Sequence, residues 1–288
     1  MKRIFPESEL IINADGSCFH LHIRPEQLAD KIILVSDPAA VQLVASHFGS
    51  QECEIESREF HTITGEYKDK RITCLSYGFG SENIDIVLNE LDTLANIDYS
   101  TREERSEHRT LTLVNIGISE GVQAGILPGT IVASKKNIGL DGLLNYYAGR
   151  NDVCDLSLEK AFIEHMCWNT IKGVPYVVTT EDDLLKQIAQ EDIQCGFIVS
   201  CIGFYSPQGR GLRLPLEDVN LKERLASFEY EGSHIQNIDM ESASIVGLAA
   251  LLGHKAVSCC VVDDAKQIAV LGNNQSFKSL IQLVLDRI

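Results

Sequence analysis

Short runs of apolar residues alternate with amphipathic segments along most of the chain, and this alternation predicts a succession of strands and helices. Strands are predicted at 31–35, 59–66, 71–76, 111–116, 130–134, 174–180, 195–202, 234–239 and 255–262. Apolar residues at helical spacing predict helices at about 41–48, 84–94, 156–169, 181–190, 217–228, 240–252 and 276–288. The last strand is apolar almost throughout, which is typical of a central strand covered on both faces.

This order of elements predicts an α/β fold, a three-layer α/β/α sandwich with a central mixed, twisted sheet. The chain has 288 residues, a length that suits one large domain or two smaller ones. It contains no internal repeat and no low-complexity segment, and the charged stretch 98–109 has the character of a loop or a helix end rather than a linker. We therefore expect one domain over 1–288, with the polar residues 1–30 as an N-terminal extension.

The stretch 237–253 combines the end of an expected strand with a helix of small and branched apolar residues. Gly253 suits the left-handed position that commonly ends a helix. Glu241 lies at the junction, where a carboxylate favours a helix N-terminus. Its two oxygens could also accept hydrogen bonds from a vicinal diol such as the 2′- and 3′-hydroxyls of a ribose. Both interpretations of Glu241 fit this stretch alone.

Polar residues and glycines follow several expected strands. Glycine-containing turns lie at 76–81 and 117–121, and acidic residues follow the strands at Asp37 and Asp263. Open α/β sheets bind ligands at the carboxyl ends of their strands, so these positions predict a site along that edge. Because strand ends are generally polar, this pattern alone gives only modest support for a ligand site.

Composition narrows the classes of partner and compartment. The formal charge of −16 argues against nucleic acid or an anionic membrane as a partner, since both select basic surfaces. Nine cysteines without a Cys-x-x-Cys pair, several of them in apolar runs, indicate free thiols in a reducing compartment. With no apolar leader at the N-terminus and no run of 18 apolar residues, we expect a cytoplasmic protein.

Four short motifs occur in order along the chain. Residues 19–21 read Phe-His-Leu, 58–60 read Arg-Glu-Phe, 204–210 read Phe-Tyr-Ser-Pro-Gln-Gly-Arg, and 240–242 read Met-Glu-Ser. Together they resemble the uridine phosphorylase branch of the nucleoside phosphorylase family over about residues 19–265. Members of that family cleave a nucleoside with phosphate and give a free base and ribose 1-phosphate.

The resemblance implies a base site and a ribose site. It assigns Gln208 and Arg210 to hydrogen bonds with uracil, Phe204 to packing on the base, and Met240 and Glu241 to the ribose. An amide that both donates and accepts suits the alternating edge of a pyrimidine dione. Arg210 could stabilise the negative charge that builds on uracil as the glycosidic bond breaks.

The resemblance also implies that two residues act across a dimer interface. His20 would reach the 5′-hydroxyl of the nucleoside in the neighbouring subunit, and Arg58 would reach its phosphate. The expected partners are a small nucleoside or base and further copies of the chain, as a homodimer or larger homo-oligomer. No metal and no cofactor are expected beyond phosphate as a co-substrate.

The phosphate loops depart from the family pattern. In the first loop Ser36 takes the place of a glycine and an alanine takes the place of an arginine. In the third loop Asn115 replaces a second arginine, Ile118 replaces a threonine beside Ser119, and Glu120 adds a negative charge. Each lost hydrogen bond between charged groups is worth about 1.5–3 kcal/mol, so two losses could weaken phosphate binding by several powers of ten.

The expected phosphate ligands are therefore Arg58, Ser36 and Ser119. Asp264 is a further catalytic candidate, because related purine-specific enzymes use an aspartate at this strand end as an acid; a solvated turn explains it equally well. The sequence leaves three possibilities: phosphorolysis of uridine or a related nucleoside, hydrolysis with water in place of phosphate, and nucleoside binding by a non-catalytic relative.

Overall fold

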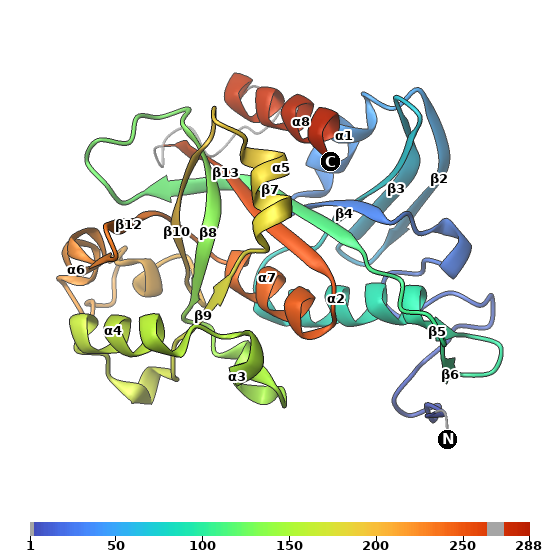
Figure 1. Cartoon of the computed structure of the whole chain (residues 1–288), viewed down its shortest axis with the longest axis horizontal. Coiled ribbons are helices and arrows are strands. Elements are labelled where there is room, and N and C mark those ends of the chain that lie inside the picture. The colour runs from blue at the N-terminus through green and yellow to red at the C-terminus, as the bar shows by residue number, and fades with distance from the viewer. Residues whose placement is uncertain (1–2, 264–273) are drawn as a thin grey trace.

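A computed structural model describes residues 3–263 and 274–288 and contains a large mixed sheet with helices on its faces (Figure 1). The strands are β1 (Lys31–Val35), β2 (Ser50–Ser57), β3 (Phe60–Tyr67), β4 (Lys70–Ser76), β5 (Ile97–Asp98), β6 (Glu103–Glu104), β7 (Thr112–Gly121), β8 (Ile131–Gly139), β9 (Tyr176–Thr179), β10 (Gln194–Ser200), β11 (Glu229–Tyr230), β12 (Ser233–Asp239) and β13 (Lys255–Asp263). The helices are α1 (Pro38–Ala45), α2 (Ser81–Asn96), α3 (Arg150–Val153), α4 (Leu156–Met166), α5 (Asp182–Ala189), α6 (Leu221–Ser227), α7 (Ser242–Leu251) and α8 (Gln275–Arg287).

The main sheet runs in the order β11-β12-β10-β8-β13-β7-β1-β4-β3-β2, with β9 beside β8. Its centre is parallel, since β13, β7, β1 and β4 all run the same way. The pairs β2–β3, β3–β4 and β8–β13 are antiparallel, so the sheet is mixed as predicted. The parallel centre gathers the carboxyl ends of several strands at one edge, where an α/β sheet can form a site.

One extra pairing bends part of this sheet into a ring. The last residues of β7 pair with β12, with Ile238 opposite Glu120 and Asn237 opposite Gly121. The strands β12, β10, β8, β13 and β7 thereby close on themselves. This closure brings the end of β7 against the end of β12, two segments far apart in the sequence.

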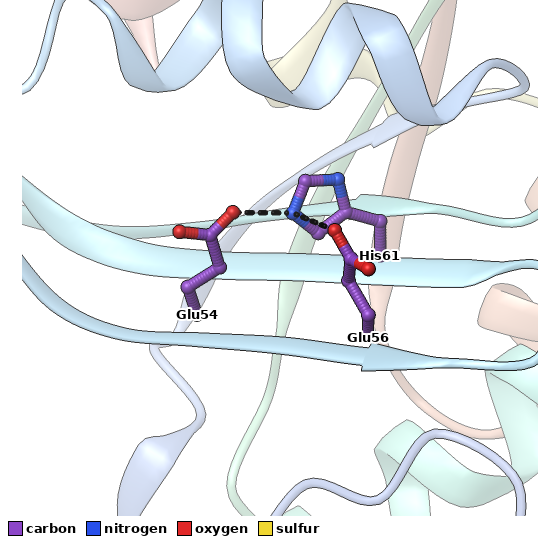
Figure 2. Close-up of side chains that lie close together, drawn as sticks. All are labelled: Glu54, Glu56 and His61. Carbon is purple, nitrogen blue, oxygen red and sulfur yellow. Dashed lines mark hydrogen bonds and ion pairs between the residues drawn. The ribbon is translucent and has the colours of Figure 1, made fainter.

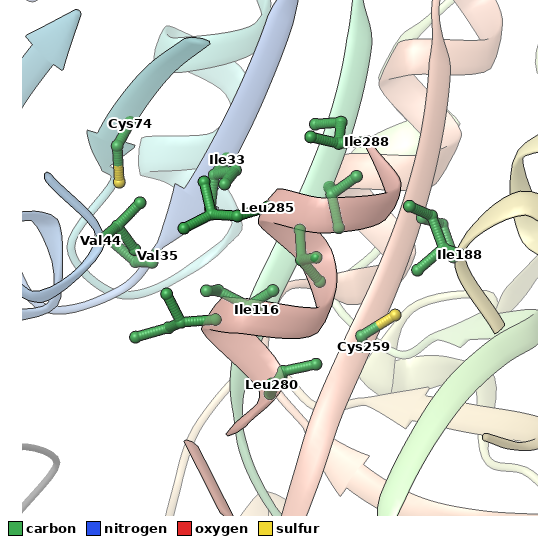
Figure 3. Packing of buried hydrophobic residues seen from close by; sticks show 14 of the residues in the cluster. Ile33, Val35, Val44, Cys74, Ile116, Ile188, Cys259, Leu280, Leu285 and Ile288 are labelled. Carbon is green, nitrogen blue, oxygen red and sulfur yellow. The ribbon is translucent and has the colours of Figure 1, made fainter. Parts of the chain in front are cut away.

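Three apolar clusters hold helices against the sheet. The first packs α1, α5 and α8 on one face, the second packs α2, α7 and the N-terminal segment on the other, and the third lies beneath α4 and α6. Figure 3 shows Leu280 and Leu285 of α8 pointing toward Ile33, Ile116 and Cys259 of the sheet. The helical layers on both faces confirm the predicted sandwich.

The apolar pattern misplaced several element boundaries. It missed β2, an edge strand whose sequence is polar and mostly exposed, so that no alternation of apolar residues marks it. It read 117–121 as a turn, whereas β7 continues through Gly121 because β13 and β12 pair with it there. It ended β8 at 134, whereas the strand continues to Gly139. The charged stretch 98–109 includes the two-stranded pair β5–β6.

Two further expectations can be compared with the described residues. Gly253 has a φ of +76°, the left-handed conformation predicted for the end of α7. All nine cysteines are free thiols, and Cys74, Cys201, Cys259 and Cys260 are buried. In the part of the chain that the structure describes, no helix has both the length and the apolar character needed to cross a membrane.

Candidate functional site

A cavity of about 200 Å³ lies at the carboxyl ends of β1, β7 and β12. It brings together seven of the residues proposed from the sequence: Ser36, Ser119, Phe204, Gln208, Arg210, Met240 and Glu241. His20 and Arg58 do not line it, and Asp264 lies outside the described residues. One chain therefore brings together the proposed base residues, two of the three proposed ribose residues and two of the three proposed phosphate residues.

Glu241 occupies the N-cap position of α7 and is buried in the wall of this cavity. Its Oε1 accepts a hydrogen bond of 2.9 Å from the backbone N–H of Gly80, at the N-terminus of α2. Burial, and after it the nearby charge of Asp239, raises the pKa of Glu241 to about 8, against its ordinary value of 4.5. Its carboxyl group can therefore exchange a proton near neutral pH.

Asp239 is the last residue of β12 and lines the same cavity, two residues before Glu241. Its carboxylate accepts a 2.6 Å hydrogen bond from the hydroxyl of Ser200 and another from the hydroxyl of Ser242. Burial raises the pKa of Asp239 to about 6, although these hydrogen bonds oppose the shift. Sequence reasoning treated Asp239 only as a strand end; its place two residues before Glu241, just ahead of a helix, could have indicated the pair.

Arg210 lines the same cavity from the loop that follows β10. Its Nη1 donates to the backbone oxygen of Phe204 across 2.6 Å and to Oε1 of Gln208, and its Nη2 donates to Glu120. The guanidinium carbon lies 3.9 Å from the centre of the Phe204 ring, a cation–π contact. Arg210 thus already has several partners within the chain, and Phe204 packs on its guanidinium.

The corner expected to hold phosphate is poor in positive charge. Asn115 does not face a ligand freely, because its amide donates to Ser258 across 3.0 Å and accepts from Tyr77 across 3.1 Å. Ser119 accepts a 2.7 Å hydrogen bond from Asn237. Among the described residues that line the cavity there are four carboxylates and one cation, Asp37, Glu120, Asp239, Glu241 and Arg210.

His20 and Arg58 have other contacts and do not line this cavity. His20 is held by Glu90 of α2, whose carboxylate lies 2.6 Å from Nδ1 of His20 and 2.9 Å from its backbone nitrogen. Arg58 is exposed in the turn between β2 and β3, with a φ of +56°, and its guanidinium lies 5.4 Å from the ring centre of Phe19. In this arrangement neither residue lines the cavity of its own chain.

One group of side chains has donors of the kind that bind metal ions. Figure 2 shows the imidazole of His61 between the carboxylates of Glu54 and Glu56 on the neighbouring strand. Nε2 of His61 lies 2.9 Å from Glu54, which also accepts a 2.6 Å hydrogen bond from Gln42. An ordinary histidine–glutamate hydrogen bond accounts for this arrangement, and we assign no metal to it.

Several cavity residues were not singled out from the sequence as ligands. Tyr77 and Cys260 are buried in its wall, Phe79 is 71% exposed at its rim, and Phe277 reaches it from α8. Tyr77 and Phe79 belong to the glycine-containing turn after β4 and could have been inferred from it. Phe277 and Cys260 could not, because only the packed sheet brings their elements to this edge.

Comparisons with known proteins agree with this architecture. A family model described as the phosphorylase superfamily matches residues 30–288. The chain is 26% identical over 263 residues to a uridine phosphorylase of Thermococcus kodakarensis, covering 90% of this chain and 81% of that protein. It is 23% identical over 277 residues to a DeoD-type purine nucleoside phosphorylase of a Geobacillus strain, covering 93% of this chain and 96% of that protein.

Solved structures show the same fold. A Trypanosoma brucei nucleoside phosphorylase, described as showing uridine phosphorylase activity, superposes with a TM-score of 0.85 at 24% identity over 97% of this chain and 99% of that one. A purine nucleoside phosphorylase of Toxoplasma gondii, bound to immucillin-H, gives a TM-score of 0.67 at 18% identity over 96% of this chain and 98% of that one.

Proposed function

The chain belongs to the phosphorylase superfamily, and on that premise we propose that it cleaves the N-glycosidic bond of uridine or a related nucleoside. In the phosphate-dependent reaction the bond between base and ribose breaks and an oxygen of hydrogen phosphate bonds to the ribose carbon. The proton of hydrogen phosphate passes, directly or through solvent, to the base, and the products are a free base and ribose 1-phosphate. Relatives that act on uridine and relatives that act on purine nucleosides both match the chain, so the preference for uridine rests on the residues of this site.

One observation carries the proposal. Gln208 and Arg210, the residues suited to a base, line the same cavity as Glu241, the residue suited to a ribose. A nucleoside has its base and its vicinal diol at opposite ends, so it can contact both groups at once. Residues 208–210 and 241 come from different elements, and their meeting in one cavity supports a nucleoside more than either motif does alone.

The proposed reaction follows from the residues that would contact the base and the residues that would contact the ribose of the nucleoside. At the base end, the Arg210 guanidinium favours negative charge on the departing base, which lowers the barrier to breaking the bond. At the ribose end, Glu241 in its ionised form accepts hydrogen bonds from the two hydroxyls and orients the sugar. The carboxylates of Glu241 and Asp239 also favour the positive charge that develops on the ribose as the base departs.

Among the described residues that line the cavity, Arg210 is the one cation and it already bonds Glu120, so phosphate would need a further positive group. Arg58 is the candidate, and because it does not line its own cavity it would have to come from a second copy of the chain. We therefore propose a homodimer as the smallest active unit, with His20 and Arg58 serving the partner's site. Asp264 remains an untested candidate for the acid.

Phosphate-independent hydrolysis is a second candidate. Glu120 is paired with Arg210 and Lys222, and the raised pKa of Glu241 favours its neutral form, which leaves Asp37 and Asp239 as acidic groups of the described lining without a paired cation. Their charge disfavours a dianion more than it disfavours a neutral water molecule. In that reaction water attacks the ribose carbon, the base leaves, and a proton is released to solvent or to the base.

The test is release of uracil from uridine by the purified full chain, with and without added phosphate. Release that depends on phosphate, with ribose 1-phosphate as product, supports the first proposal. Equal release without phosphate, giving free ribose, supports hydrolysis. Absence of base release from uridine, inosine and adenosine alike, with nucleoside binding still measurable by calorimetry, would overturn both and leave a nucleoside-binding protein.

A further inference from the structure

Glu120 lies between two cations at the base end of the cavity. Its Oε2 accepts from Nη2 of Arg210, and its Oε1 accepts from Nζ of Lys222 on α6 across 2.5 Å. The three side chains carry one negative and two positive charges, so the carboxylate is neutralised and one positive charge is left over. In the sequence Glu120 stood out as an unfavourable charge near a phosphate loop, and the structure gives it a different set of partners.

These contacts hold Arg210 in one orientation. The planar guanidinium is bonded on Nη2 by Glu120 and on Nη1 by the backbone oxygen of Phe204, and it stacks on the Phe204 ring. A planar group fixed at two of its nitrogens and on one face has little freedom left. Lys222 affects Arg210 indirectly, because it donates a hydrogen bond to the Glu120 carboxylate that fixes Arg210.

The orientation of Arg210 in turn sets that of Gln208. A guanidinium has only donors, so the amide oxygen of Gln208 faces it, and Nη1 of Arg210 donates to that oxygen. The amide nitrogen then lies on the other branch of a side chain that is 3% exposed and lines the cavity. With one lone pair of the oxygen engaged by Arg210, the N–H group of Gln208 is the donor that this amide can offer to a ligand.

We propose that Glu120 and Lys222 are positioning residues that fix Arg210 and Gln208, so that the base end accepts a carbonyl oxygen and disfavours an amino group. A carbonyl oxygen accepts from the amide N–H, whereas an amino group would place a donor against a donor. The inference deepens the proposed function and rests on it, since it assumes that the base lies at this end of the cavity.

The test compares wild-type chain with Glu120→Gln, Lys222→Met and Lys222→Arg. Binding by calorimetry and turnover are measured for two pairs of nucleosides, uridine against cytidine and inosine against adenosine. In each pair an oxo group beside a ring N–H is exchanged for an amino group beside an unprotonated ring nitrogen. Glu164→Gln is the matched control, because Glu164 pairs with Lys160 on the exposed surface of α4, away from the cavity. Thermal unfolding of every variant establishes that it is folded.

In Glu120→Gln we expect the preference for the oxo member of each pair to fall roughly tenfold, with KM rising more than kcat falls. Lys222→Met should give a smaller loss, and Lys222→Arg should retain the preference because a guanidinium can also reach Glu120. In an Arg210→Met background, Glu120→Gln should have no further effect on preference, since its action passes through Arg210. Glu164→Gln should match wild type throughout.

Unchanged preference in a folded Glu120→Gln variant of an active enzyme overturns the positioning role and leaves the proposed function intact. An additive effect in the Arg210→Met background also overturns it. Binding without turnover in wild type refutes the proposed function, while the ratios of dissociation constants still test the positioning role. A wild-type chain that binds none of the four nucleosides refutes both.

Discussion

The backbone N–H of Gly80 donates to Oε1 of Glu241 across 2.9 Å and so links the N-terminus of α2 to the N-terminus of α7. A helix N-terminus favours an ionised carboxylate. Burial of Glu241 beside Asp239 favours the protonated form instead. This effect is the larger of the two and raises the pKa of Glu241 to about 8. The free protein therefore holds a protonated acid at the position where the ribose is proposed to bind.

This raised pKa predicts the pH dependence of stability. The pKa of Glu241 in the folded chain, about 8, exceeds its ordinary value of 4.5, so between those values the folded state binds more protons than the unfolded state. Stability from this group is complete below about pH 4.5 and is lost as the pH rises through 8. Glu241→Gln, which cannot ionise, should gain stability relative to wild type between pH 5 and pH 9, by an amount on the order of a few kcal/mol.

Urea unfolding at pH 5, 7 and 9 measures that difference. Glu164→Gln serves as the control, since Glu164 is exposed and its Oε1 lies 3.8 Å from Nζ of Lys160, too far for a strong ion pair. A difference between wild type and Glu241→Gln that stays constant across the three pH values would contradict the prediction.

Nucleoside binding should release protons at pH 7. Two ribose hydroxyls donate to Glu241 best when it is ionised, so binding should lower its pKa and expel the proton that the free protein holds. Calorimetric titration of uridine in two buffers with different ionisation enthalpies measures this release. The proton release should vanish in Glu241→Gln, and its persistence there would assign the proton to another group.

Gly80 should matter to the site through its backbone conformation. Its φ of +94° is one that side-chain-bearing residues rarely adopt, and an added Cβ would meet the carboxylate of Glu82 at 2.6 Å. Gly80→Ala should cost about 1–3 kcal/mol of stability and should weaken nucleoside binding by shifting the N–H that bonds Glu241. Gly16→Ala is the matched control, because Gly16 has a φ of +84° in open space away from the cavity. Equal effects of the two variants on binding would contradict the link to Glu241.

A dimer whose sites are shared should allow complementation. Arg58→Ala and Glu241→Ala chains, each expected to be strongly impaired, should regain phosphate-dependent activity when refolded together, because a mixed dimer contains one site with both residues intact. The activity of the mixture against each variant alone measures this. Recovery would fail if Arg58 acted within its own chain or had no role.

The packing of α8 should contribute heavily to stability. Leu280 is fully buried against the sheet (Figure 3), and replacing a buried leucine with alanine costs about 2–5 kcal/mol. Leu280→Ala should therefore unfold at markedly lower denaturant concentration than wild type. Leu214→Ala, at a leucine that is 78% exposed, should change stability by less than about 0.5 kcal/mol. A Leu280→Ala chain as stable as Leu214→Ala would contradict the packing.

The sequence predicted the layers of the fold because apolar periodicity reports burial, and β13 is buried almost throughout. It missed β2, since that polar edge strand buries almost none of its side chains. It placed the last residues of β7 in a turn, because their strand character comes from pairing with distant strands rather than from their own composition.

The sequence likewise predicted only part of the candidate site. Short motifs identified Gln208, Arg210 and Glu241, which the structure gathers around one cavity. The ionic partners of Glu120 could not be predicted, because Lys222 is 102 residues away in sequence and reaches it only through the placement of α6. The hydrogen bonds that occupy Asn115 are also invisible in the sequence, since they depend on β4 and β13 lying near β7.

The pairing of β7 with β12 has a mechanical consequence. Glu120, which bonds Arg210, and Ile238, which precedes Asp239, are direct partners in one hydrogen-bonded ladder, and that ladder belongs to a closed ring of strands. This wall cannot hinge outward without breaking hydrogen bonds of the ring, so the strand segments that carry Glu120 and Asp239 keep their relative positions before a ligand arrives. Passage of substrate and product must then depend on the rim, where the exposed rings of Phe79 and Phe204 lie on loops rather than in the sheet.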